Sequence, residues 1–118
     1  MAEQATEHDL EPQRVSELGD AQLVDVRTPA EYETSRLEGA LHIPLEELQD
    51  EASNLDRTRP VVFYCRSGDR SQMAVDAFRA SGWDAYAMSG GLVAWSEEGL
   101  PLEPEGAEVA PHSGLPPA

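Results

Sequence analysis

Short apolar runs alternate along this chain with segments of helical spacing, and this alternation limits the possible folds more than any other feature. Apolar runs at residues 23–26, 40–43, 60–64 and 84–88 predict short buried strands. The segments between most of these runs can form the crossover helices that parallel strands need. The sequence therefore predicts an α/β fold, in which helices cover both faces of a central, mostly parallel sheet.

Local signals place the ends of several helices. Thr28 can cap a helix that starts at Pro29, and Glu31 can complete a capping box with Thr28. A further helix is expected within residues 45–55, where leucines recur near helical spacing. The helix that follows residue 70 is expected to end at Gly82 and to bury one face made of Met73, Ala74, Ala77 and Phe78.

One domain is expected, because 118 residues leave no room for a second. We place it at residues 9–103, between a flexible N-terminus at residues 1–8 and a disordered tail at residues 104–118. The tail is rich in proline, carries acidic but no basic side chains, and cannot bury a core. No apolar run approaches the roughly 18 residues of a membrane span, and the N-terminus lacks the features of a signal peptide.

The chain is strongly acidic, with 23 Asp and Glu residues against 8 basic residues, all of them arginine, and a net charge of −15. Nucleic acids and anionic membranes require positive charge on a protein, so neither is an expected partner. The single cysteine, Cys65, rules out an internal disulfide and fits a reducing compartment, so we expect a cytoplasmic protein. The histidines are scattered and indicate no metal site. His42 is expected to pack or form a hydrogen bond at the edge of the core, and a role as a general base is the alternative.

Cys65 opens the loop Cys-Arg-Ser-Gly-Asp-Arg-Ser, at residues 65–71, between a strong strand signal and a strong helix signal. A tight loop ahead of a helix turns its backbone N–H groups inward, and the helix N-terminus adds partial positive charge. Arg66 and Arg70 reverse the local sign of charge, and Gly68 permits backbone angles that a side chain forbids. Such surroundings favour a nucleophilic thiolate. The alternative is a buried cysteine that acts only as a small apolar side chain.

This loop resembles the active-site loop of the rhodanese family of sulfurtransferases, and three further segments extend the resemblance. Residues 23–32, 37–45 and 90–101 are similar to the other signatures of the family, in the family's order. Together the segments span roughly residues 10–102. The resemblance implies a rhodanese-like fold and a monomer that uses no metal or organic cofactor.

The resemblance also implies the chemistry. Cys65 would attack the outer sulfur of a donor such as thiosulfate, become a persulfide, and pass the sulfur to cyanide or a thiol, including a thiol of a protein partner. The rest of the loop would bind the substrate: Arg66, Ser67, Gly68, Asp69, Arg70 and Ser71. Arg66 and Arg70 would bind the sulfonate end of the donor or stabilise the loop. Asp25 and Arg27 would support the loop by ion pairing, or form a purely structural pair.

Two other functions stay open. Phosphatases and arsenate reductases of the cell-cycle phosphatase type use a similar loop, but their cysteine and arginine stand one residue further apart than Cys65 and Arg70. The shorter loop suits a single sulfur atom better than a tetrahedral phosphate. The second alternative is a non-catalytic module, or a persulfide carrier that serves one protein partner. The presence of Cys65 within the full loop argues against a purely binding role.

Overall fold

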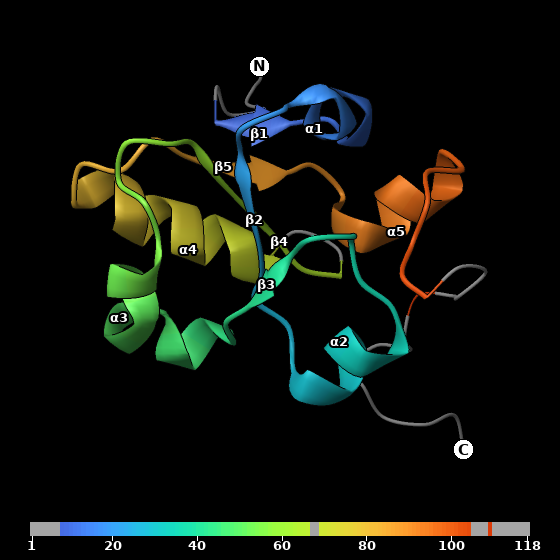
Figure 1. Ribbon diagram of the computed structural model, residues 1–118, viewed down its shortest axis with the longest axis horizontal. Helices are drawn as coiled ribbons and strands as arrows, with labels where there is room; N and C mark the ends of the chain where they lie inside the picture. The colour runs from blue at the N-terminus through green and yellow to red at the C-terminus, as the bar shows by residue number, and fades with distance from the viewer. Residues whose placement is uncertain (1–7, 67–68, 105–108, 110–118) are drawn as a thin grey trace.

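Parallel strands form a single sheet at the centre of the computed structural model, which describes residues 8–66, 69–104 and 109 (Figure 1). Within these residues the strand order is β1–β5–β4–β2–β3, with β1 (Asp9–Leu10), β2 (Gln22–Asp25), β3 (Leu41–His42), β4 (Val61–Tyr64) and β5 (Ala85–Met88). The helices are α1 (Pro12–Glu17), α2 (Pro29–Thr34), α3 (Leu48–Glu51), α4 (Asp69–Ala80) and α5 (Gly91–Glu97). All strand pairs are parallel, which confirms the predicted α/β sheet.

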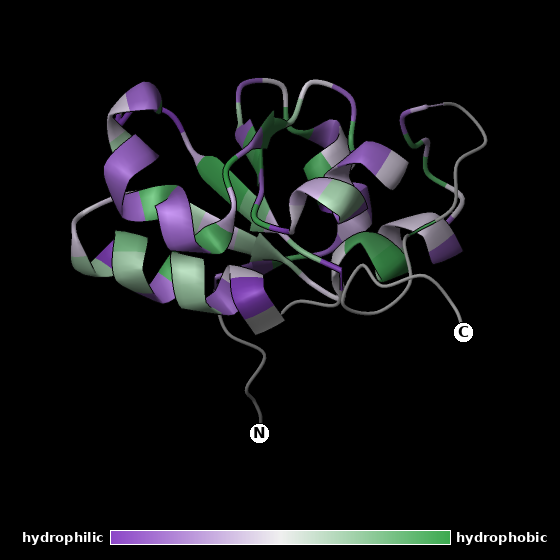
Figure 2. Cartoon of the chain, turned by 90° about the horizontal axis from the view of Figure 1, so that it is seen from below, coloured by the Kyte–Doolittle hydropathy of each residue, from purple (hydrophilic) through white to green (hydrophobic). Residues whose placement is uncertain are grey.

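The side chains of β4 alternate between two apolar clusters, one on each face of the sheet. Val61 and Phe63 belong to the cluster beneath α3 and α4, whereas Val62 and Tyr64 belong to the cluster beneath α1 and α5. Figure 2 shows hydrophobic strands at the centre, between helices that contain both hydrophobic and hydrophilic residues. Helices therefore cover both faces, as predicted. None of the described helices is both long and apolar enough to cross a membrane.

Some elements differ from the sequence-based expectation. Strand β1 and helix α1 were not expected, because a strand of 2 residues is too short to show a period. The helix expected within residues 45–55 is divided into the 3₁₀ segment η1 (Leu45–Glu47), helix α3 and a second 3₁₀ segment, η2 (Ala52–Asn54). Like charges four residues apart, at Glu46 and Asp50 and at Glu47 and Glu51, disfavour one continuous α-helix there.

The buried face of α4 is rotated from the predicted one. Ser71, Ala74, Val75 and Phe78 are buried, at the i, i+3, i+4, i+7 spacing of a single helix face. Met73, expected in the core, is instead 63% exposed, and Ala77 is exposed as well. The prediction for these two residues was wrong because the sheet contacts a face that includes Val75. Their exposure leaves apolar surface on the outside of α4.

The two ends of the chain fall mostly outside the described residues. Of the flexible N-terminus expected at residues 1–8, only His8 is described, and of the tail expected at residues 104–118, only Pro104 and Val109. Val109 packs against the cluster beneath α1 and α5. The boundaries of the domain therefore stay predictions.

Candidate active site

The thiol of Cys65 lies directly after β4, at the edge of the sheet where the parallel strands end. Ligands of α/β sheets bind at this edge. Only 1% of Cys65 is exposed, and its Sγ lies 3.7 Å from Oγ of the buried Ser71 in a hydrogen bond. The hydroxyl of Ser71 can also donate to a thiolate, which accepts hydrogen bonds. Ser71 is thus positioned to stabilise negative charge on the sulfur.

The amino-terminal end of α4 follows Cys65 after a short loop. Free N–H groups and partial positive charge at such an end favour a bound anion. Arg66 is half-buried, and Arg70 lies in the first turn of α4 with 32% of its side chain exposed. The predicted substrate contacts of the remaining loop residues lie outside the described parts of the chain: Ser67, Gly68 and the side chain of Asp69.

The first turn of helix α5 forms hydrogen bonds with the backbone of Cys65 and Arg66. The N–H of Leu92 donates to the carbonyl of Cys65 at 2.8 Å, and the N–H of Val93 donates to the carbonyl of Arg66 at 3.0 Å. Gly91 makes this approach possible, because a Cβ on it would lie 2.5 Å from both carbonyl oxygens. Its φ of +62° also belongs to the left-handed region that favours glycine. Residues 90–101 were singled out from the sequence by their resemblance to a family signature, but the contact of this segment with the loop was not predicted.

Substituting Gly91 by alanine is expected to lower the free energy of unfolding by about 2–4 kcal/mol, because left-handed strain adds to the clash with the two carbonyls. Urea denaturation measures this loss. Gly99→Ala is the matched control, since Gly99 has a φ of +77° but open space where a Cβ would lie. An equal loss in the two variants would show that the contact with the Cys65 loop contributes nothing.

Glu31 is a member of the site that the sequence analysis identified only as a helix cap. Its buried carboxylate accepts hydrogen bonds from both terminal nitrogens of Arg70, Nη1 at 2.9 Å and Nη2 at 3.2 Å. It also accepts from the N–H of Thr28 at 3.0 Å and completes the predicted capping box of α2. The ion pair therefore ties the first turn of α2 to the first turn of α4. Nothing local in the sequence indicates this pairing across 39 positions.

The ion pair shifts the pKa of both partners toward their charged forms. Burial alone would raise the pKa of Glu31, but the hydrogen bonds from Arg70 and Thr28 and the charge of Arg70 outweigh it, so this pKa is lowered. The hydrogen bond to Glu31 is the largest influence on Arg70 and raises its pKa above the ordinary value. Both groups are thus charged throughout the neutral range, and Arg70 is held in a fixed position.

Glu31→Gln is expected to reduce the loss of unfolding free energy that the protein suffers as the pH falls below neutral. A carboxylate with a lowered folded pKa stabilises the fold above its ordinary value of 4.5, and that contribution is lost as the pH falls through the folded pKa. Urea denaturation from neutral pH to below 4.5 measures the slope, on dilute protein because the isoelectric point is near 4.3. Glu33→Gln, on an exposed residue of α2, is the control. A Glu31→Gln slope equal to that of the control would contradict the prediction.

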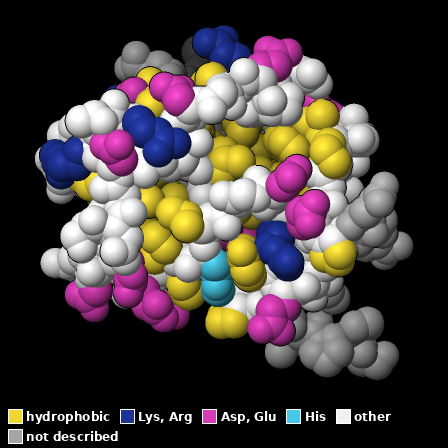
Figure 3. All heavy atoms as spheres, in the orientation of Figure 1, with side chains coloured by type: hydrophobic (Ala, Val, Ile, Leu, Met, Phe, Trp, Pro, Cys, Tyr) yellow, Lys and Arg dark blue, Asp and Glu magenta, His cyan; other side chains and the backbone are white. Residues whose placement is uncertain are grey.

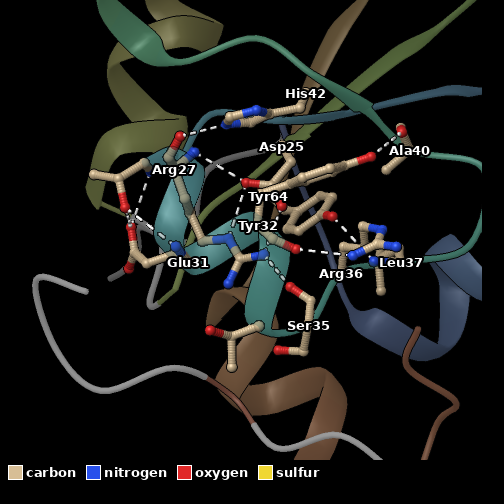
Figure 4. Close-up of polar contacts among 12 residues, drawn as sticks. Asp25, Arg27, Glu31, Tyr32, Ser35, Arg36, Leu37, Ala40, His42 and Tyr64 are labelled. Carbon is tan, nitrogen blue, oxygen red and sulfur yellow. Dashed lines mark hydrogen bonds and ion pairs between the residues drawn. The ribbon is translucent and has the colours of Figure 1, made fainter. Parts of the chain in front are cut away.

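Asp25 and Arg27 form a fully buried ion pair at the end of β2 (Figure 4). Arg27 donates to Asp25 through Nε at 2.9 Å and Nη2 at 2.6 Å, and Nη2 also donates to the carbonyl of Ser35 at 2.5 Å. Burial would lower the pKa of Arg27, but the hydrogen bond and charge of Asp25 outweigh it and raise this pKa. Burial and the charge of Asp25 raise the pKa of Tyr64, the residue before Cys65.

His42 is hydrogen-bonded at the edge of the core, as expected. Its Nε2 lies 2.8 Å from the carbonyl of Arg27, so this nitrogen donates, and its ring stacks on Tyr32 with centroids 4.4 Å apart. Figure 4 shows His42 and Tyr32 on the same side of the Asp25–Arg27 pair. These contacts stabilise the backbone at Arg27, so His42 has a structural role here.

These residues together suit a nucleophilic sulfur that reacts with an anionic substrate. The thiol of Cys65 lies at the end of a strand, in contact with the hydroxyl of Ser71 and close to the start of α4. Among the described residues no group of three or more His, Cys, Asp or Glu side chains could hold a metal ion.

Comparison with known proteins gives consistent matches. The family model described as "Rhodanese-like domain" matches residues 11–98. A sulfurtransferase of Allochromatium vinosum is 38% identical over 96 residues, which are 80% of this chain and 90% of that protein. A helix-turn-helix-type transcriptional regulator of Mycobacterium tuberculosis is 39% identical over 99 residues, which cover 81% of this chain but only 43% of the regulator.

The fold matches solved structures over a similar share of the chain. A rhodanese-related protein from Thermoplasma volcanium aligns with a TM-score of 0.77 and 27% sequence identity, over 80% of this chain and 96% of that chain. The family model matches the part of the chain that contains β2, α2, the Cys65 loop and α5, and the solved structure covers a similar share of the chain.

Proposed function

Because this chain belongs to the family of rhodanese-like domains, we propose that it is a sulfurtransferase that carries a sulfur atom as a persulfide on Cys65. The donor is an anion such as thiosulfate, and the acceptor is cyanide or a thiol. The observation that carries this proposal is the position of Cys65 at the end of β4, with Ser71 Oγ 3.7 Å from its sulfur and the start of α4 close by.

The proposed reaction has two displacement steps, and neither needs an added oxidant. In the first, the Cys65 thiolate attacks the outer sulfur of thiosulfate; a new S–S bond forms, the S–S bond of thiosulfate breaks, and sulfite leaves with the bonding electron pair. In the second, the acceptor attacks the outer sulfur of the persulfide and the Cys65 thiolate leaves. With cyanide the product is thiocyanate, and with a thiol it is a new persulfide.

The charged side chains near Cys65 are assigned to two roles, binding the donor and holding the loop in position. Arg66, next to Cys65, is assigned to the sulfonate end of the donor, whose charge the acidic body of the protein would otherwise repel. Arg70 is engaged by both oxygens of Glu31, so it is assigned to holding the loop in position. The buried pair of Asp25 and Arg27 holds the neighbouring end of β2. No metal or organic cofactor enters these steps. The single cysteine, which forms no disulfide, suits the cytoplasm, and we assign the protein as a monomer.

The direct test is to incubate the protein with thiosulfate, remove the excess, and measure the intact mass. A gain of one sulfur atom that disappears when cyanide is added, with release of thiocyanate, is the expected result. A folded protein with a free thiol that gains no sulfur from thiosulfate or from a persulfide donor would overturn the proposal and favour a binding module. Activity on a phosphate ester would instead indicate the phosphatase alternative.

A further inference from the structure

A groove with a volume of about 430 Å³ lies between α4 and the segment formed by η1 and α3. Its lining combines apolar side chains with the polar side chains of Gln49 and Ser81; the apolar ones include Leu45, Leu48, Ala52, Met73, Ala77 and Trp83. Figure 3 shows apolar side chains on this face, above a group of acidic side chains in the region of η1 and α3. Met73 is 63% exposed, and flexible methionine side chains suit surfaces that bind other proteins. The sulfur chemistry proposed above makes no use of this surface.

No described residue of the Cys65 loop lines the groove, but one end of the groove approaches this loop through Met73 and Ala74 of α4. Met73 and Ala74 lie within one helical turn of Ser71, whose hydroxyl contacts the Cys65 sulfur. On the opposite wall, the N–H of Leu45 donates to the carbonyl of Val26, which lies at the end of β2 beside β4. An occupant of the groove would therefore extend alongside α4 with one end near the reactive sulfur.

Four carboxylates lie in or beside the groove. Glu46 lines the groove, and Glu47 of η1, Asp50 of α3 and Asp76 of α4 are exposed on the elements that form it. Among the residues that the structure describes, none of these four carboxylates forms an ion pair. At the far end, Arg57 lies over the Trp83 ring and donates to the carbonyl of Ser81. A second copy of this chain would bring the same negative charge, so a basic partner fits and a self-contact does not.

Resting on the sulfur transfer proposed above, we propose that this groove docks the sulfur acceptor, a protein with a basic amphipathic helix that carries or adjoins a cysteine. Apolar side chains of that helix would occupy the groove, as in other helix-in-groove complexes, and its lysines or arginines would face the acidic rim. Its cysteine thiolate would attack the outer sulfur of the Cys65 persulfide. The S–S bond of the persulfide breaks, the electron pair stays on Cys65, and the acceptor leaves as the persulfide.

Binding is tested without sulfur chemistry, by fluorescence anisotropy of a labelled synthetic helix with leucines on one face, lysines on the other and serine in place of cysteine. We expect Glu46→Lys/Glu47→Lys to weaken binding about tenfold and to reduce its salt dependence. Met73→Gln, which removes apolar contact and keeps the charge, is expected to weaken binding about threefold or more. Glu97→Lys/Glu98→Lys changes the net charge equally at two exposed residues at the carboxyl end of α5, and is expected to change binding less than twofold.

Transfer is tested with the same helix carrying one cysteine at either end, added to protein loaded with sulfur. We expect each groove variant to slow transfer to the helix by about the factor by which it weakens binding, and to leave transfer to cyanide unchanged. Failure of Cys65 to load sulfur contradicts the proposed function alone, because the binding measurement does not depend on it. Normal loading with equal transfer by all variants contradicts the docking proposal alone.

Two results would overturn the docking proposal directly. One is equally tight binding of a scrambled helix of the same composition, which would show only attraction between opposite charges. The other is self-association in sedimentation that Glu46→Lys/Glu47→Lys abolishes, which would identify a second copy of the chain as the occupant. Selective loss in the groove variants, with the α5 control unchanged, supports the proposal.

Discussion

The Cys65→Ala variant is expected to gain no sulfur from thiosulfate and to release thiocyanate only at the background rate. Both displacement steps pass through the Cys65 sulfur, and the chain has no second cysteine to replace it. Intact mass after incubation with thiosulfate measures the first step, and a thiocyanate assay measures the complete cycle.

The fold of this variant should persist, so that a loss of activity reports on the chemistry. Alanine removes a single buried sulfur atom at the end of β4, and the hydrogen bonds from Leu92 and Val93 involve only backbone carbonyls. We expect the free energy of unfolding to fall by about 1 kcal/mol. Sulfur uptake by Cys65→Ala that matches the native protein would show that another group is the nucleophile.

The sequence contains most of the information for elements that depend on local signals. Strand β4 was predicted because four consecutive apolar, β-branched or aromatic residues form it. The capping box of Thr28 and Glu31 was also predicted, since both partners lie within one turn. The buried face of α4 was predicted incorrectly, with Met73 in the core instead of Val75. Both side chains are apolar, and only the position of the sheet decides which of them is buried.

In the candidate site, too, local features could be predicted from the sequence and contacts between distant segments could not. The Cys65 loop is continuous in sequence, so its glycine, arginines and following helix could be recognised together. The pairing of Glu31 with Arg70 and the support of Cys65 by α5 join segments that are distant in sequence, and they depend on the order of strands in the sheet. The sequence shows a glycine at position 91 but not why glycine is needed there. The structure explains it, because a Cβ at this position would clash with the carbonyls of Cys65 and Arg66.

Replacing Arg27 by methionine is expected to lower the free energy of unfolding by about 3–5 kcal/mol, because the change leaves the buried carboxylate of Asp25 without its counter-ion. Urea denaturation measures the loss. Arg79→Met is the control on a partly exposed Arg–Asp pair, with Nη2 of Arg79 3.7 Å from Oδ1 of Asp84, and its expected loss is about 1 kcal/mol or less.

A double-mutant cycle separates the ion pair from the packing of the Arg27 side chain. Asp25→Asn/Arg27→Met removes both charges, so it should lose clearly less stability than the sum of the two single variants. Arg27→Lys keeps a charge but cannot form both contacts with the Asp25 carboxylate, so an intermediate loss is expected, and this variant is informative even if Arg27→Met does not fold. Additive losses in the cycle would mean that Arg27 stabilises the end of β2 through its contacts with Ser35 and Tyr64 rather than through Asp25. The loop next to Cys65 would then depend on packing at this edge of the sheet and not on the buried charges.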